Sequence, residues 1–384
     1  MIINKLKYII IIFLPFILTG CWDSVEINER HVVLEVAIDK NGALKQSSTE
    51  AQDKRYEVTY TIPDIAKLSG QDSLSEDVKT AIITKSSTIA TSVDEVERKT
   101  QNTVTFSHTK ALVLGEELLK DKELFKATID GLIRNMQIGR GTSILAVKGK
   151  AGKLTQAKNP QNPIIGLYVM KFFNNSERPT SYAKQQTLGN LIKELQNTGV
   201  TTIPVISDQE GTVLIQGAAV IKDYELADWI NKEQVRGELF VEGKIKEVPI
   251  VVKYKGENLT YNIEEEESKI SFNANNGEWC AEIEIKVKGN ITEFVSSEQN
   301  ELFNESSIRE IGSLIKAEIN RQTQESIVYS KEINVDFLNI GLEMYRKHPK
   351  VWESYKNQWL ITGYKNIPIK VVTIVTIHNT GMLE

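Results

Sequence analysis

The stretch CAEIEIKVKGNIT, residues 280–292, carries the clearest structural pattern in the chain. Ile283, Ile285 and Val287 alternate with charged residues, so an extended strand places the apolar side chains on one face and the charged ones on the other. Such alternation is typical of an antiparallel sheet with one packed face and one face in water. The pattern predicts a half-buried strand in the C-terminal half of the chain.

Further strands and helices are expected around this stretch. Strands are predicted at residues 244–254, 259–263, 269–273 and 367–377. Helices are predicted at residues 305–323, 337–347 and 351–360. The four consecutive acids at 264–267 are interpreted as a solvated turn between two strands. A run of strands followed by helices and a final strand is typical of an α+β domain.

The N-terminal half alternates strands with amphipathic helices. Strands are predicted at residues 32–38, 56–62, 103–114 and 142–147. Helices are predicted at residues 86–100, 122–135, 164–173 and 188–196. Two Asn-Pro pairs within 159–163 break the chain before the last two helices, so residues 151–206 are interpreted as a helical subdomain or an insertion.

The segment 207–211, Ser-Asp-Gln-Glu-Gly, is the best candidate for a linker, with a strand at 213–221 and a short helix at 224–231 expected after it. The predicted parts are a leader at 1–20, an N-terminal α/β domain at 21–150, the helical subdomain at 151–206 and a C-terminal α+β domain at 212–384. The expected fold class is therefore a multidomain mixture of α+β and α/β structure, with mixed sheets flanked by helices. The C-terminal domain is expected to contain antiparallel strands, then helices and a final strand.

A leader sequence begins the chain. Lys5 and Lys7 precede an apolar run at 8–16, and Leu18-Thr19-Gly20-Cys21 follows it. This pattern is typical of a secretory signal peptide, and the cysteine directly after two small residues predicts the bacterial lipoprotein form. Cys21 is expected to carry a diacylglycerol and an N-acyl chain, which anchor the chain to the outer face of a membrane. The alternative, a transmembrane helix, needs about 20 apolar residues, and this run is too short.

Charge and cysteine content limit the possible function classes. Without residues 1–20 the chain keeps 44 cations and 51 carboxylates, a net charge of about −7. Proteins that bind nucleic acid present a basic face, so a nucleic-acid partner is not expected. General adsorption to anionic lipid is not expected either. Acylation of Cys21 leaves Cys280 without an intramolecular disulfide partner, and Cys280 is interpreted as a small buried apolar residue.

No motif of a known enzyme class is found. The four histidines are scattered, at His31, His108, His348 and His378. No His-Glu-x-x-His pair and no Gly-x-Ser-x-Gly elbow occur, and residues 149–153 lack the spacing and the hydroxyl of a phosphate-binding loop. No catalytic residue, metal site or cofactor is therefore expected beyond the lipid on Cys21. The residues alone indicate a membrane-tethered binding or scaffold protein.

Three groups of motifs carry a resemblance to a known family. The first is Gly20-Cys21-Trp22-Asp23 with Glu26-Ile27-Asn28, and the second is Phe106-Ser107-His108 with residues 112–117 and 130–134. The third comprises residues 217–223, 229–231 and 236–237, then Asp336, Phe337, Gly341 and residues 345–352. In this order they resemble the Ger(x)C family, the lipoprotein C-subunits of nutrient germinant receptors in endospore-forming bacteria. The resemblance covers essentially the whole chain after the leader.

The resemblance implies a receptor of three parts. Two partners are integral membrane proteins, and this chain is the lipid-anchored third, on the outer face of the inner spore membrane. A small-molecule germinant is a possible ligand of the receptor that this chain does not necessarily bind. The resemblance implies several α/β modules and identifies no catalytic residue.

Aromatic and basic residues near the C-terminus suggest a docking surface for these partners. Tyr345, Arg346, Trp352, Tyr355 and Trp359 lie close together in the sequence, and such residue types are common at the centres of interfaces. The alternative is that the aromatic residues belong to the core.

Two other functions remain open from the sequence. A solute-binding lipoprotein of a transporter would share the anchor, but it needs two similar lobes joined by a hinge. A cell-wall enzyme would need the motifs that this chain lacks.

Overall fold

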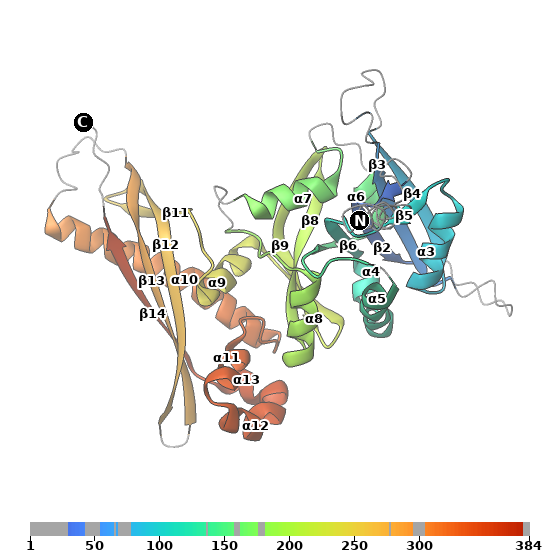
Figure 1. Ribbon diagram of the computed structural model, residues 1–384. Coiled ribbons are helices and arrows are strands. Elements are labelled where there is room, and N and C mark those ends of the chain that lie inside the picture. The colour runs from blue at the N-terminus through green and yellow to red at the C-terminus, as the bar shows by residue number, and fades with distance from the viewer. Residues whose placement is uncertain are drawn as a thin grey trace, which may run out of the picture.

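Two large sheets organise the chain in the computed structural model (Figure 1). The structure describes residues 30–42, 54–64, 67, 78–135, 137–156, 162–175, 181–275, 278–294 and 304–378. The predicted leader and Cys21 lie outside the described residues. A small parallel pair, β1 (Arg30–Val32) and β5 (Thr103–Thr105), accompanies the larger of the two sheets.

The larger sheet has eight strands and mixed direction. In sheet order they are β10 (Glu225–Ile230), β9 (Thr212–Lys222), β8 (Val200–Gln209), β7 (Ser143–Val147), β6 (Ala111–Gly115), β2 (Glu35–Lys40), β3 (Tyr56–Pro63) and β4 (Lys79–Ser86). The central strands β2, β6, β7 and β8 run parallel, and the outer strands are antiparallel hairpins. Every residue of β6 and β7 is buried, which explains their continuous apolar sequence.

Helices cover both faces of this sheet. One face packs against α3 (Ile89–Arg98), α4 (Glu116–Leu119), α5 (Lys122–Asn135) and α8 (Leu188–Asn197). The other face packs against α6 (Ala151–Gln156) and α7 (Ile165–Asn174). The helices expected at 122–135, 164–173 and 188–196 are confirmed within a residue or two.

Two buried carboxylates of β2 hold the starts of α6 and α7. Asp39 accepts hydrogen bonds from the N–H groups of Ala151 and Gly152, both at 2.8 Å. Glu35 accepts one from the N–H of Gly166 at 3.0 Å. Burial raises the pKa of both carboxyls, that of Glu35 to about 7. The first turns of both helices are thus fixed by side chains that lie more than a hundred residues away in the sequence.

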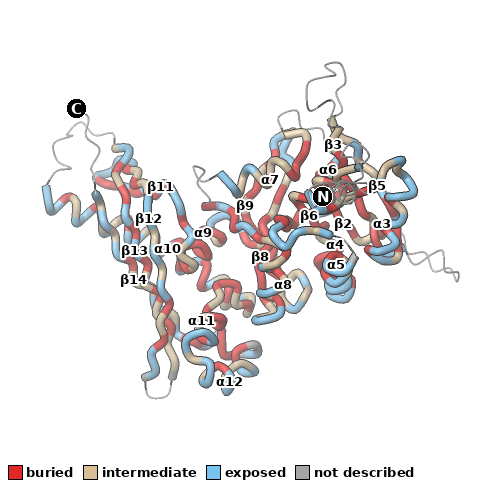
Figure 2. The backbone as a smooth tube through the Cα atoms, viewed as in Figure 1, coloured by how far each residue is buried: buried red, intermediate tan, exposed pale blue. Residues whose placement is uncertain are grey.

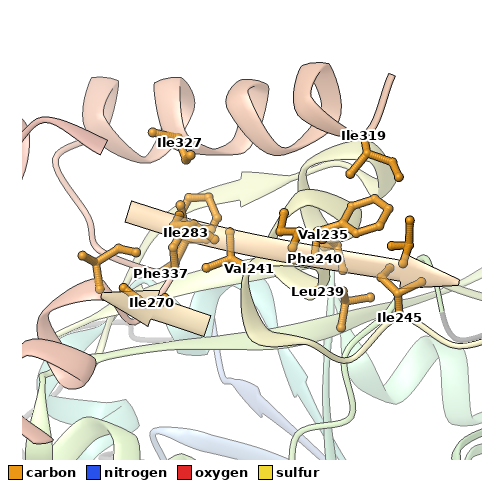
Figure 3. Packing of buried hydrophobic residues seen from close by; sticks show 14 of the residues in the cluster. Val235, Leu239, Phe240, Val241, Ile245, Ile270, Ile283, Ile319, Ile327 and Phe337 are labelled. Carbon is orange, nitrogen blue, oxygen red and sulfur yellow. The ribbon is translucent and has the colours of Figure 1, made fainter. Parts of the chain in front are cut away.

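The smaller sheet has four strands and extends to one side of the molecule (Figure 1). In order they are β11 (Val248–Tyr254), β12 (Glu257–Asn275), β13 (Glu278–Phe294) and β14 (Ile369–Ile377). The first three are antiparallel, and β14 runs parallel to β13. One face packs against α9 (Lys232–Glu242) and the 28-residue helix α10 (Glu305–Glu332). Figure 3 shows side chains of α9, α10 and the long strands directed into this single core.

Short helices follow α10 and complete the C-terminal half. They are α11 (Ile340–Lys347), α12 (Pro349–Gln358), the π-helical turn η4 (Trp359–Gly363) and α13 (Tyr364–Asn366). The strand pattern quoted at 280–292 lies within β13, with Ile283, Ile285 and Val287 buried. Mixed sheets flanked by helices, with strands, helices and a final strand in the C-terminal half, confirm the predicted fold class.

Three local expectations about strands and helices are wrong. The strand expected at 103–114 is broken into β5 and β6. The helix expected at 305–323 continues to Glu332. The helix expected at 224–231 is strand β10. A bulge in β10 between Leu226 and Asp228 puts Leu226 and Trp229 on one face, which imitates a helical spacing.

The acidic run 264–267 is not a turn, because it lies inside the continuous strand β12. Lys288 pairs with Glu265 at 2.9 Å from the neighbouring strand, and Lys286 lies opposite Glu267. These cross-strand lysines make a run of acids compatible with a strand.

The segment 207–211 is a hairpin turn between β8 and β9. The linker expected there is therefore wrong, since strands on both sides of it belong to one sheet. The division of the chain into domains stays a prediction.

Candidate functional site

The short helices α11, α12 and α13, together with η4, form a unit at residues 340–366 that we call the C-terminal helical tip. Asp336 organises it from the preceding loop. Its carboxylate accepts hydrogen bonds from the N–H groups of Ile340 (3.0 Å) and Gly341 (2.6 Å) and from the indole Nε1 of Trp359 (3.2 Å). Burial raises the pKa of Asp336 to about 6, against the opposing effect of these bonds. One side chain thus caps α11 and fixes the aromatic core of the tip.

Position 341 must be a glycine for this arrangement. A Cβ on Gly341 would lie 2.6 Å from the indole Nε1 of Trp359 and 2.9 Å from the ring of Trp352. The close approach lets the backbone N–H reach Asp336 while the two indoles pack against the helix. The sequence resemblance pointed to Asp336 and Gly341 without a role, and the structure supplies one.

The aromatic residues expected at an interface divide into two groups. Trp352 is 9% exposed and Trp359 is 3% exposed, and their rings pack edge to face with centroids 5.7 Å apart. Tyr355 is partly buried against Trp359, and the ring of Tyr364 also packs against Trp359. Trp352 and Trp359 therefore belong to the core of the tip.

Tyr345 and Arg346 lie on the surface of α11. Tyr345 is 47% exposed, and Arg346 forms an ion pair with Glu343 one turn earlier. Ile361, in the π-helical turn η4, is 71% exposed. Figure 2 shows exposed residues covering the outer side of α12 in the same unit. The tip therefore offers both apolar and basic side chains to solvent.

A polar pocket of about 310 Å³ opens where the tip meets the rest of the molecule. Its walls come from α8, α9, β12 and α11. Its charged lining residues are Glu194, Glu242, Lys244, Lys269, Glu343, Arg346 and Lys347. Its apolar lining residues are Val241, Ile270, Leu338 and Leu342. A recess of this size with charged walls can hold a polar side chain or a small polar molecule.

A buried ion cluster lies beneath this pocket. Lys184 is 6% exposed, and its Nζ lies 2.9 Å from the carboxylate of Glu238 and 2.7 Å from that of Glu242. Thr202 donates a hydrogen bond to Glu238, and the amide of Asn339 donates one to Glu242 at 2.8 Å. The cluster therefore ties the strand β8 of the larger sheet to α9 and to the start of α11.

The pKa values in the cluster follow from burial and from the partners. Burial raises the pKa of Glu238 to about 7. Burial opposes ionisation of Glu242 as well, but Lys184 and Lys244 outweigh it and lower its pKa to about 2. Burial likewise disfavours the Lys184 ammonium, but attraction to both carboxylates raises its pKa. The cluster therefore holds a charged Lys184 and an ionised Glu242 at neutral pH.

Sequence reasoning missed this cluster. The only local signal is Glu238, which stands directly before the apolar run Leu239-Phe240-Val241. A carboxylate in such a run needs a buried partner, but the sequence gives no indication that the partner is Lys184, more than fifty residues away.

No group of three or more His, Cys, Asp or Glu residues in the described part of the chain is arranged to hold a metal ion. Within the same described ranges, no helix is both long and apolar enough to span a membrane. Cys280 is partly buried in β13 as a free thiol.

Two family models match the chain one after the other. Residues 23–208 match the spore germination protein N-terminal domain, and residues 216–381 match the "spore germination B3/GerAC like, C-terminal" family. The two matches cover nearly all of the sequence after the predicted leader.

Several curated proteins of Bacillus subtilis are similar over their whole length. Spore germination protein B3 is 22% identical over 92% of each chain, and spore germination protein KC is 21% identical over 100% of this chain and 97% of its own. Spore germination protein A3 is 20% identical over 98% of both. The crystal structure of the GerBC protein superposes with a TM-score of 0.61 at 18% identity, covering 90% of this chain and 97% of that one.

Proposed function

Because the chain belongs to the spore germination protein family, whose N-terminal and C-terminal models it matches in series, we propose that it is the lipid-anchored, non-catalytic C-subunit of a nutrient germinant receptor. In this role it assembles with two integral membrane subunits on the outer face of the inner spore membrane. A small-molecule germinant acts on the assembled receptor.

The position of the family match supports this proposal most directly. The N-terminal match starts at residue 23, two residues after Cys21. Every matched residue therefore follows the predicted lipidation site, as a tethered extracytoplasmic protein requires.

A lipid tether explains how such a subunit works without a catalytic site. Several acyl chains hold a protein at the bilayer stably, since each buried methylene contributes about 0.8 kcal/mol. Confinement to the membrane raises the effective concentration of the chain near membrane-embedded partners. Contacts of modest affinity between subunits are then sufficient for assembly.

The helical tip is the proposed docking region for these partners. Tyr345 and Arg346 are accessible, and Tyr355 is partly accessible, whereas Trp352 and Trp359 support the tip from within. The fold does not support the alternative of a solute-binding lipoprotein, because an eight-stranded and a four-stranded sheet do not form two similar lobes.

Mass spectrometry of the chain purified from spores tests the anchor. We expect residues 1–20 to be absent and Cys21 to carry acyl chains. A Cys21→Ala variant should lose the acyl groups and leave the membrane fraction. Spores that carry this variant should germinate more slowly with nutrients. The matched control is Cys280→Ala, which changes the partly buried thiol in β13. It should keep the acyl groups on Cys21, the membrane association and the germination rate of the wild type. An unmodified thiol at Cys21 or an intact leader in the native protein would contradict the proposal.

A further inference from the structure

The helical tip has a charge opposite to that of the rest of the chain. Residues 340–366 contain five cations and two carboxylates, a net charge of +3, whereas the whole chain carries −5. The cations are Arg346, Lys347, Lys350, Lys356 and Lys365. After Glu353 no carboxylate side chain occurs until Glu384. A local excess of one sign on a protein of the opposite sign selects partners by charge.

Part of this positive charge is not neutralised within the described residues. Arg346 and Lys347 pair with Glu343, and Lys356 pairs with Glu353. By contrast, Lys350 on α12 is exposed and makes no ion pair in the part of the chain that the structure describes. Lys269, in the wall of the polar pocket, is also exposed and has no ion-pair partner there.

The same unit exposes large apolar side chains. Ile361 is 71% exposed and Tyr345 is 47% exposed. The carbonyl of Ile361 accepts a hydrogen bond from the amide of Asn334, which fixes the turn η4 with this side chain outward. Exposed aromatic and apolar residues beside cations form the common composition of a protein-binding surface.

The pocket next to α11 gives this surface a recess. Its lining includes four cations and three carboxylates, together with the apolar Ile270 and Leu342. The carboxylates Glu242 and Glu343 are already paired with cations, whereas Lys269 has no ion-pair partner in the described ranges. A flat lipid surface cannot enter such a recess, whereas a carboxylate side chain of a protein can. The recess therefore favours a protein partner over an anionic bilayer.

We infer that the helical tip and its pocket bind an acidic segment of a partner protein, with carboxylate side chains facing Lys269 and Lys350 and an apolar side chain against Tyr345 or Ile361. The choice of a protein held at the same membrane rests on the proposed function. The lipid anchor does not depend on the charge of the tip or on its pocket. An experiment can therefore contradict the binding of an acidic segment without contradicting the proposed function.

Charge reversal in full-length, lipidated protein tests this inference. Lys269→Glu and Lys350→Glu change exposed residues that form no ion pair in the described ranges, so the fold should survive. The readout is the amount of the two membrane subunits that co-purifies with the tagged chain from detergent-solubilised membranes at low and moderate salt. We expect the double variant to retain roughly tenfold less partner at low salt, and wild-type retention to fall as salt rises.

Matched controls carry the same change of charge elsewhere. Lys193→Glu on α8 and Lys316→Glu on α10 alter exposed lysines outside the tip and should retain partners like the wild type. Thermal unfolding of all variants checks the fold. Equal retention by the tip and control variants overturns the inference while the receptor assignment stands. Failure of the wild type to retain any membrane subunit overturns the proposed function.

A vesicle assay separates the lipid alternative. Binding of the Cys21→Ala chain to phosphatidylglycerol vesicles, lost in the tip variant while subunit retention is unchanged, would replace the acidic segment by an anionic bilayer. Absence of such binding supports the protein partner.

Discussion

At the scale of single residues, Glu266 is the clearest departure from the surface pattern of its strand. A bulge between Ile263 and Glu265 shifts the register, so Glu266 lies opposite Val287 and faces inward. Its Oε2 accepts a hydrogen bond from the N–H of Ile245 at 2.7 Å, and its Oε1 has no partner among the described residues. Burial raises the pKa of Glu266 to about 8.

This raised pKa makes stability depend on pH in a defined direction. The ordinary value is 4.5, so the contribution of Glu266 to stability is full below pH 4.5 and is lost as the pH rises through about 8. In the wild type, we expect this effect to lower the free energy of unfolding by about 3 kcal/mol between pH 5 and pH 8. The Glu266→Gln variant should not show this decrease. Urea unfolding at the two pH values measures this, with exposed Glu267→Gln as the control. A variant that keeps the wild-type pH dependence would show that Glu266 is ionised without penalty.

Lys184 is the opposite case, a buried cation that two buried carboxylates share. Replacement by Met should cost about 3–5 kcal/mol at neutral pH, because Glu238 would remain buried without a cation and Glu242 would keep only Lys244. The loss should shrink at pH 5, where the freed carboxylates take up protons. Chemical unfolding of Lys184→Met beside Lys193→Met, an exposed lysine on α8, measures both effects. A loss that does not change with pH would mean that packing, not charge, is what Lys184 supplies.

At the scale of elements, one carboxylate holds the helical tip together. Asp336→Ala removes the acceptor for two backbone N–H groups and for the indole of Trp359, which should cost about 2–4 kcal/mol. Amide exchange should rise over residues 340–366 and stay slow in β12 and β13. Asp336→Asn keeps one acceptor and should give an intermediate loss. Uniform loss of protection over the whole chain would show that the tip does not open on its own.

Elements with a local signal were predictable from the sequence. The period of apolar residues located α5, α7 and α8 within two residues, and the alternation at Ile283, Ile285 and Val287 located β13. Predictions failed where a bulge changed the side-chain period, at Leu226 in β10 and at Glu265 in β12. A bulge is visible only in the pairing with another strand, and one sequence does not contain that information.

The candidate site was predictable only in part. The aromatic and basic residues of the tip predicted a docking surface there. Composition alone, however, does not distinguish a buried indole such as Trp352 from an exposed phenol such as Tyr345. Their separation depends on Asp336 and Gly341, whose role appears only once the helix and the indoles are packed together. The pocket beside α11 joins four elements that lie far apart in the sequence.

At the scale of the whole molecule, the larger sheet joins the two halves of the sequence. β8 lies almost wholly in the match to the N-terminal family and most of β9 lies in the match to the C-terminal family, yet the two form one hairpin. A fragment of residues 21–208 should therefore expose β8 and aggregate, whereas a fragment of residues 21–230 keeps all eight strands and should unfold at a higher temperature. Thermal unfolding and light scattering of both fragments test this. Equal behaviour would mean that β9 and β10 add nothing to the sheet.

The hairpin at 207–211 also bears on how such genes diversify. A crossover between two related genes at the border of the family matches would join a β8 from one parent to a β9 from the other. Ile206 of β8 and Ile215 of β9 lie opposite each other in the hairpin. In such a chimera, each of these two positions would face a residue that comes from the other parent. Chimeras spliced a little later, after β10, inherit the sheet intact, so productive exchange between lineages is expected to favour that later junction.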